Sequence, residues 1–298
     1  MDVNIVMLGT AGSSPTKERS MPSIAIKYEG DLILFDCGES AQLQMLRYGV
    51  NFSKLKAIFI SHAHGDHVIG VAGLVRTLGM NRRTEPLKIF IPKGYESVIK
   101  MLLSFDRALL EYSIEVIGVG SSGVVYKGNG YSIKSFKLKH SIPAYGYVFK
   151  EDDRRRFIVS KTAKLGIKGE MHSSIQKNGS LVIGKKTVKL EDVTSLVKGK
   201  KIAYAADTRP SSDTVKAAGD ADLLIHESSY AEEDVELAKE RMHSTAFEAA
   251  TVAKKAKVKR LVLTHISARY SNVKKLEDDA KKAFKESRVA SDGDNIIV

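Results

Sequence analysis

The stretch "ISHAHGDHVIG" (residues 60–70) decides how this chain is interpreted. It places three of the chain's eight histidines and one aspartate within six positions. The apolar run "LKAIFIS" (55–61) before it predicts a buried strand, and the pattern at 67–80 predicts a helix. Imidazoles and a carboxylate that gather where a strand ends are typical of a site, because such sheets build their sites at the carboxyl ends of strands.

The side chains of this stretch have the chemistry of metal ligands. His62 and His64 leave the strand on a loop, where both can face one point. Asp66 and His67 open the helix and can face a second point. Nitrogen and oxygen donors suit Zn²⁺. A hydrogen-bonded polar turn is the alternative, and three histidines around an aspartate favour metal over it.

The composition limits the class of protein. The chain has 298 residues, 43% of them hydrophobic, which is enough for a core in one large domain or two small ones. No apolar run reaches the roughly 18 residues that span a bilayer. The start "MDVNIVMLGT" lacks a signal peptide's basic region and cleavage site. Because no apolar run is long enough, we expect no membrane association. The single cysteine, Cys37, cannot form an internal disulfide, so we expect a reducing, cytoplasmic location.

Positive charge is concentrated in one segment. The net charge is +12, and residues 150–201 hold 14 Lys and Arg against six Asp and Glu, a net of +8. A cationic surface suits a polyanionic partner, although a lysine-rich solvated surface would carry the same charge. The segment is polar, with only short apolar runs. We therefore expect a single domain over 1–298 with a protruding basic arm inserted at 151–195.

Strand and helix patterns alternate along the rest of the chain, as in an α/β protein. Strands are predicted at 4–8, 23–28, 31–36, 55–61, 87–92, 114–118, 123–127, 131–138, 145–149, 201–207, 221–227, 258–265 and 295–298. Helices are predicted at 39–49, 67–80, 94–105, 244–256 and 273–285. Several of these strands end at a His or an Asp, namely His62, Asp207, His226 and His265.

The quartet at 62–67 has the form His-x-His-x-Asp-His and resembles the signature of the metallo-β-lactamase superfamily. That family requires a later histidine, a bridging aspartate and a last histidine in this order, and His140, Asp207 and His265 match them. The resemblance implies an αβ/βα sandwich, two mixed β-sheets flanked by helices. It also implies two Zn²⁺ per subunit, with Mn²⁺ or Fe²⁺ able to use the same donors. The implied ligands are His62, His64, His140 and Asp207 on one ion, and Asp66, His67, Asp207 and His265 on the other.

Further motifs resemble ribonuclease Z, the tRNA 3′-processing endonuclease. They are Pro15-x-Lys17-x-Arg19, "LFDCGESAQ", "HSIPAYGY", "DTRP", "HST" (243–245) and "HISARY". The sequence departs from that family at two places. It has Ser20 where the family has Asn, and it has "HESS" (226–229) where the family has His-Glu-Ala-Thr. The segment "LGIKGEMHSS" also lacks the Gly-Pro motif of that family's tRNA-binding arm. The resemblance implies an endoribonuclease that cuts precursor tRNA after the discriminator nucleotide, leaves a 3′-OH, and forms a homodimer.

Phosphodiester hydrolysis then suggests a role for each candidate residue. Two cations can bind a non-bridging oxygen and lower the pKa of water to about 7, and Asp66 can accept the proton of that water. His243 is the expected proton donor to the leaving 3′ oxygen. Glu227 is its expected partner, and the alternative is that His226 and Glu227 only close a strand. Asp36 could orient a ligand histidine or serve only in a turn. Expected phosphate contacts are Lys17, Arg19, Ser267 and Arg269.

Two other functions fit parts of the same sequence. A small-molecule phosphodiesterase or lactonase would use the metal site without needing a basic arm, since one fold serves many substrates. A non-catalytic RNA-binding protein would not need the intact set of ligands.

Overall fold

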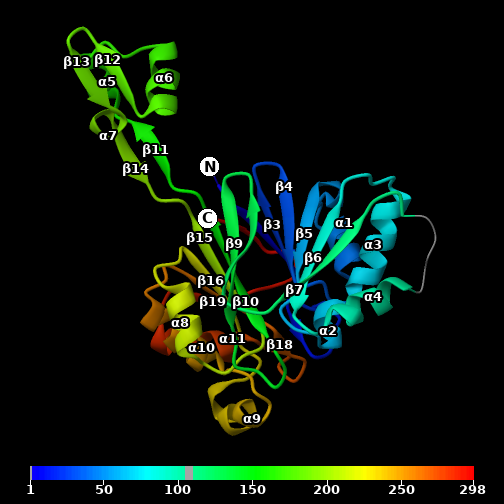
Figure 1. Cartoon of the computed structure of the whole chain (residues 1–298). Helices are drawn as coiled ribbons and strands as arrows, with labels where there is room; N and C mark the ends of the chain where they lie inside the picture. Colours follow the sequence, from blue (N-terminus) through cyan, green and yellow to red (C-terminus); the bar gives the residue numbers. More distant parts are fainter. Residues whose placement is uncertain (1, 105–109) are drawn as a thin grey trace. The chain divides into compact units, whose positions relative to one another are not determined.

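The computed structural model describes residues 2–104 and 110–298. Its first β-sheet has seven strands in the order β20-β1-β3-β4-β5-β6-β7 (Figure 1). Strands β20, β1, β3 and β4 pair antiparallel, and β4 to β7 pair parallel. The strands are β1 (Asn4–Gly9), β3 (Ser23–Tyr28), β4 (Asp31–Phe35), β5 (Leu55–Phe59), β6 (Leu87–Pro92), β7 (Ile114–Val119) and β20 (Asn295–Ile297).

The second sheet also has seven strands, in the order β19-β17-β16-β15-β10-β9-β8. Its strands β15, β16, β17 and β19 are parallel, whereas β10 pairs antiparallel with β15 and β8 with β9. The strands are β8 (Gly123–Gly128), β9 (Tyr131–Lys137), β10 (Tyr145–Glu151), β15 (Lys201–Ala205), β16 (Leu223–Glu227), β17 (Leu261–Thr264) and β19 (Ser287–Val289). A short parallel pair, β2 (Ala11–Gly12) with β18 (Ile266–Ser267), joins the two ends of the chain.

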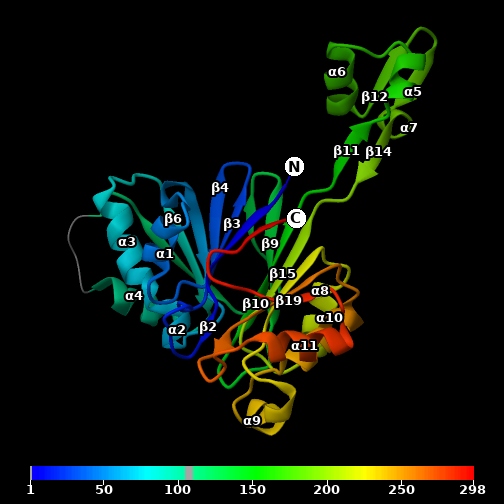
Figure 2. The same ribbon diagram turned by 180° about the vertical axis from the view of Figure 1, so that it is seen from behind.

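Helices cover the outer face of each sheet, as the two opposite views show (Figures 1 and 2). Helices α1, α3 and α4 flank the first sheet, and α8, α10 and α11 flank the second. This is the αβ/βα sandwich of two mixed sheets that the sequence predicted. The helices are α1 (Ala41–Arg47), α2 (Gly65–Val68), α3 (Gly70–Met80), α4 (Glu96–Ser104), α8 (Ser212–Ala218), α9 (Val235–Glu240), α10 (Ala246–Ala256) and α11 (Lys274–Ala283).

Alternating side chains of the strands divide the apolar residues among three cores. In β4, Ile33 and Phe35 point into the layer between the sheets, while Leu32 and Leu34 face the helices. Two tyrosines of the second sheet also hydrogen-bond across the central layer. Tyr147 Oη donates to Ile60 O at 2.8 Å, and Tyr204 Oη donates to Asp36 Oδ2 at 2.6 Å. The second sheet is thus tied to the strand ends of the first.

Most predicted elements are present, with differences at their ends. The helix predicted at 67–80 is two segments, α2 and α3, that meet at Ile69. The helix predicted at 94–105 is α4, and its predicted last residue lies outside the described residues. The short helices α8 and α9 and strand β19 were not predicted. Such elements of three to seven residues carry too few positions for a clear period.

Residues Glu151–Gly199 form a compact unit of their own. This unit has a small core of Ile167, Ile175, Val188 and Val193. Strand β11 pairs antiparallel with β14, and β12 with β13. Its elements are β11 (Arg154–Phe157), α5 (Val159–Lys164), α6 (Glu170–Asn178), β12 (Ser180–Ile183), β13 (Lys186–Lys189), α7 (Leu190–Val193) and β14 (Thr194–Val197). We call this unit the arm.

None of the described helices has the length and apolar character needed to cross a bilayer.

A backbone contact between two glycines holds the histidine-rich loop in place. Gly70 N donates to Cys37 O at 3.0 Å, and Cys37 N donates to His67 O at 2.9 Å. A Cβ on Gly70 would lie 1.9 Å from Gly38 O, and a Cβ on Gly38 would lie 2.3 Å from Asp66 O. Only glycine allows the turn after β4 to approach the start of α3 so closely.

This contact predicts that Gly70→Ala destabilises the protein. The new methyl group must displace backbone atoms, and overpacking of this kind costs about 1–3 kcal/mol of unfolding free energy. Gly73→Ala on the same helix is the matched control, because its Cβ would meet only the end of the Gln42 side chain, at 2.9 Å. Urea unfolding followed by circular dichroism measures both. Equal unfolding free energies for the two variants would show that the glycine contact is not required.

Candidate metal centre

Seven His and Asp side chains from five segments meet at one end of the two sheets. His62 and His64 follow β5, and Asp66 and His67 belong to α2. His140 follows β9, and Asp207 and His265 come just after β15 and β17. They form two groups with ligand atoms within 4.8 Å of one another, His62, His64, His140 and Asp207 in one and Asp66, His67 and His265 in the other.

In the first group three imidazole nitrogens face one another. His64 Nδ1 lies 3.0 Å from His62 Nε2 and 3.3 Å from His140 Nε2. Asp207 Oδ2 lies 3.6 Å from His62 Nε2 and 4.0 Å from His140 Nε2. Three nitrogens and a carboxylate oxygen around one point are the donor set of a tetrahedral zinc site.

The second group has the same character. His67 Nε2 lies 3.3 Å from His265 Nε2, and Asp66 Oδ2 lies 3.5 Å from both nitrogens. Asp207 Oδ1 is 3.3 Å from His67 Nε2 and 3.1 Å from His265 Nε2. Asp207 therefore offers one carboxylate oxygen to each group, as a bridging ligand would.

The polar atoms here are better satisfied by cations than by one another. Asp207 Oδ1 is buried and accepts no hydrogen bond from the described residues. A buried acceptor without a partner costs free energy, and so do imidazole nitrogens that face each other. Burial raises the pKa of Asp207, but attraction to His265, His67 and His62 outweighs it and holds the pKa well below its usual range. The ionised carboxylate and its neighbours fit a pair of divalent cations.

Protein groups behind the histidines fix which nitrogen faces the centre. His67 Nδ1 lies 2.8 Å from Asp36 Oδ2, and His140 Nδ1 lies 3.2 Å from Met242 O. These oxygens only accept, so each Nδ1 carries the proton and each Nε2 is free to bind a metal. Serine hydroxyls play the same part for the other two, with Ser61 Oγ at 2.9 Å from His62 Nδ1 and Ser229 Oγ at 2.9 Å from His265 Nδ1.

Asp36 orients a histidine instead of serving only in a turn. It is fully buried at the end of β4, and its carboxylate accepts hydrogen bonds from Ser61 N, Ser61 Oγ and Tyr204 Oη besides facing His67. Both Asp36 and His265 have left-handed backbones, with φ of 55° and 59°. Such conformations are rare outside glycine and cluster at functional sites.

Asp66 is held by a loop that is distant in sequence. The Ser13 N–H donates to Asp66 Oδ2 at 3.1 Å. Burial raises the pKa of Asp66, but the hydrogen bond with His265 and the charges of His67 and His265 lower it below its usual range. The carboxylate is therefore ionised and able to accept a proton or bind a cation.

His243 is paired with a buried carboxylate beside the two groups. His243 Nδ1 lies 3.0 Å from Glu227 Oε1, and Glu227 is completely buried. Burial lowers the pKa of His243, but attraction to Glu227 and the hydrogen bond between them raise it to about 9. Glu227 also accepts hydrogen bonds from Thr208 N, Ser229 N, Ser229 Oγ and Ser244 N. The pair is held rigidly, with its proton on His243.

One ion pair that the sequence reasoning missed supports this loop. The Arg209 guanidinium binds both carboxylate oxygens of Glu248, with Nη1 to Oε2 at 2.8 Å, and it also donates to His243 O. Glu248 completes the capping box of α10 with Thr245, the N-cap residue. The signal in the sequence was the motif "DTRP" (207–210), which contains Arg209 but does not name its partner.

The predicted phosphate contacts fall into two pairs. Ser267 and Arg269 line a cavity of about 860 Å³ together with the ligand side chains and His243. The Arg269 guanidinium lies over the Tyr230 ring, 4.9 Å from its centroid. Lys17 and Arg19 are not among the residues that line this cavity. Arg19 is half-buried and donates to Thr10 Oγ1 and Ala290 O, both at 2.6 Å.

Comparison with known proteins places this site in a family. Residues 3–289 match the family model described as Anti-Pycsar protein Apyc1. A ribonuclease Z of Methanosarcina acetivorans is 40% identical over 294 residues, which cover 97% of this chain and 96% of the relative.

Two solved structures have the same architecture. Human tRNase Z, short form, is 26% identical with a TM-score of 0.72, and the match covers 99% of this chain and 98% of that one. The metallo-β-lactamase fold protein YhfI of Bacillus subtilis is 18% identical with a TM-score of 0.71 over the whole of both chains. The chain therefore belongs to the ribonuclease Z family of metallo-β-lactamase-fold hydrolases, and to the family that the Apyc1 model describes.

Proposed function

We propose that this chain is an endoribonuclease that removes the 3′ trailer of precursor tRNA, cutting after the discriminator nucleotide and leaving a 3′-OH on the tRNA. The observation that carries the proposal is the 40% identity to a ribonuclease Z over nearly the full length of both chains. The two His and Asp groups and the basic charge of residues 150–201 supply the chemistry that such an enzyme needs.

The proposed ligands of each ion follow the two groups of His and Asp side chains. His62, His64 and His140 would hold one ion, His67, Asp66 and His265 the other, and Asp207 would bridge them. These nitrogen and oxygen donors suit Zn²⁺, although Mn²⁺ or Fe²⁺ could occupy them. When bound, the pair of ions would neutralise phosphodiester charge and lower the pKa of water.

The remaining roles belong to side chains of this chain. Asp66, fixed by Ser13 N, would orient the attacking water and accept its proton. His243 would donate a proton to the leaving 3′ oxygen, and Glu227 would keep it charged and directed. Ser267 and Arg269, which line the cavity, would bind phosphate oxygens. Lys17 is exposed and Arg19 is bonded within the fold, so a phosphate contact by either would lie outside the cavity.

The arm would bind the body of the tRNA. Its strand β11 carries Arg154, Arg155 and Arg156 in succession, all exposed. Lysines follow on its helices and hairpin, and folded RNA is recognised mainly through shape and backbone. A homodimer is part of the proposal. Leu43 and Leu46 on α1 are 54% and 58% exposed, and apolar surface of this kind is what a second copy could cover.

Hydrolysis of a small phosphodiester or a lactone is the second candidate. The match to the Apyc1 family model over residues 3–289 shows that the chain resembles more than one family. A two-metal centre does not select the substrate by itself. Recognition of RNA must therefore be tested directly.

The central test compares the intact chain with a variant whose arm is removed. Lys150 and Lys201 are direct partners on β10 and β15, so an Asn-Gly turn can replace residues 151–200. We expect the intact chain to cut a labelled precursor tRNA at one position, giving a 3′-OH and a 5′-phosphate. The variant should lose about 100-fold or more in kcat/KM, as when several phosphate contacts are lost.

Hydrolysis of bis-p-nitrophenyl phosphate is the control, and it should change less than twofold in the variant. If the intact chain leaves precursor tRNA uncut while it hydrolyses the small diester, the second candidate replaces the first. If the variant processes precursor tRNA normally, the arm does not bind the substrate.

A second prediction concerns His243 as proton donor. Loss of a general acid slows a reaction by about 10²–10⁴-fold when the leaving group needs a proton. His243→Ala should slow cleavage of precursor tRNA by this amount. It should slow bis-p-nitrophenyl phosphate hydrolysis far less, because nitrophenolate leaves without protonation. The metal content should stay the same. An equal loss with both substrates would remove His243 from this role.

A third prediction concerns Asp36, which holds the Nδ1 proton of His67. Asp36→Asn weakens that acceptor, and loss of such a partner typically costs 10–100-fold in metal affinity. We expect Zn²⁺ titration to show one weakened site and one unchanged site. Asp31→Asn is the control, because Asp31 begins β4, the strand that Asp36 follows, and accepts a hydrogen bond from Tyr131 of β9. Two sites of wild-type affinity in Asp36→Asn would contradict the orienting role.

A further inference from the structure

A second cavity, of about 480 Å³, lies on the outer face of the second sheet, between the sheet and helix α8. Phe136 and Val148, which belong to the core between this sheet and its helices, form its apolar floor. Four of its lining residues are lysines, namely Lys134, Lys150, Lys201 and Lys216. None of the residues that line this cavity lines the one that contains the metal centre. We call it the lysine pocket.

The lysines of the pocket are gathered by the sheet itself. Lys134, Lys150 and Lys201 lie on β9, β10 and β15, three neighbouring strands. Lys150 and Lys201 are direct cross-strand partners. Like charges in such positions destabilise a sheet. Burial lowers the pKa of Lys201, Asp220 partly opposes this, and Lys134 and Lys150 lower the pKa further.

Positive charge exceeds negative charge in the lining of the pocket, with four lysines and one aspartate, Asp213. Over the described residues, Lys134, Lys201 and Lys216 form no ion pair with an Asp or a Glu, and Lys201 Nζ donates instead to Gly219 O. Asp213 is the one carboxylate among the residues that line the pocket. The pocket therefore combines a concave shape with an excess of positive charge.

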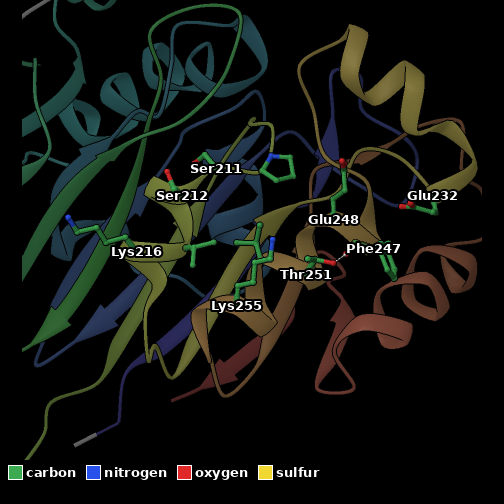
Figure 3. Close-up of a pocket in the computed structure, with 11 residues that line it drawn as sticks. Ser211, Ser212, Lys216, Glu232, Phe247, Glu248, Thr251 and Lys255 are labelled. Carbon is green, nitrogen blue, oxygen red and sulfur yellow. Dashed lines mark hydrogen bonds between the residues drawn. The ribbon is translucent and has the colours of Figure 1, made fainter.

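A neighbouring cavity provides a contrast. It lies between α8 and α10 and is lined by Lys216 and Lys255 together with Glu232 and Glu248, so it holds side chains of both charges. Figure 3 shows the Lys216 side chain extending away from Lys255 and Phe247. The ammonium group of Lys216 is thus directed out of that cavity.

We propose that the lysine pocket binds a small ligand with a terminal phosphate group, such as a 5′-mononucleotide. A terminal phosphate carries close to two negative charges near neutral pH, and lysine ammonium groups bind it as point charges. The apolar floor would accept the uncharged part of the ligand. A phosphodiester of an RNA backbone has the same oxygen chemistry but only one charge per phosphate, so four lysines around one small cavity match the terminal group better.

The test uses three adenosine-containing probes that carry a terminal phosphate, an internal phosphodiester or no phosphate. They are adenosine 5′-monophosphate, the dinucleotide ApA with one internal phosphodiester, and adenosine. Binding to the full chain is followed by the amide NMR signals of Gly123, Ser135 and Ala217, which line the pocket. The variant is Lys134→Gln/Lys216→Gln, because both side chains are exposed. The control is Lys56→Gln/Lys100→Gln, which removes the same charge from the other half of the domain.

We expect the monophosphate to shift these signals in a saturable way, with a Kd at least tenfold weaker in the pocket variant and unchanged in the control. Adenosine should leave them in place. The pocket variant should still hydrolyse bis-p-nitrophenyl phosphate at the wild-type rate, which separates this test from that of the proposed function. Equal Kd values in the two double variants, or no shift at the pocket signals, would overturn the proposal. Binding of ApA as tight as that of the monophosphate would assign the pocket to RNA backbone instead.

Discussion

The buried carboxylate of Asp36 is the interaction on which the rest of the structure depends. It ends β4 in the first sheet, accepts hydrogen bonds from Ser61 at the end of β5, and receives the hydroxyl of Tyr204 from the second sheet. Its remaining partner is the ligand histidine His67. A buried charge is tolerated only when hydrogen bonds satisfy it. One carboxylate therefore fixes the ends of β4 and β5, a tyrosine of the second sheet and the histidine-rich loop relative to one another.

The sequence predicted which side chains belong to this site better than it predicted the hydrogen bonds and ion pairs between them. The strand ends and the motif around His62 pointed to the His and Asp side chains that the structure brings together, because these features are local. Asp36 remained divided between an orienting role and a turn, since its partners come from positions up to 168 residues away. Tyr204 and the ion pair of Arg209 with Glu248 were missed for the same reason. Their contacts depend on how β15, β16 and α10 pack, which no short pattern records.

Arg19 shows why a residue in a motif does not by itself reveal its role, and its phosphate contact stays a prediction. It stands in a motif with Lys17, so a phosphate contact was predicted for both. The structure directs its guanidinium to Thr10 Oγ1 and Ala290 O. The loop around Arg19 also binds Asp292, through Ser20 N at 2.6 Å. A charged residue in a motif can thus hold a loop in place, and only the direction of its side chain separates the two roles.

The charged residues beside the metal centre and those of the arm differ in whether they are paired. Beside the candidate metal centre charged side chains pair with one another, His243 with Glu227 and Arg209 with Glu248. The arm has the opposite character. Four fully or nearly buried apolar residues form its core, which is little for a unit of this size. Its excess of positive charge repels itself and weakens that small core further. Folding alone gives no reason to keep such an excess, whereas a polyanion as large as tRNA would neutralise it on binding.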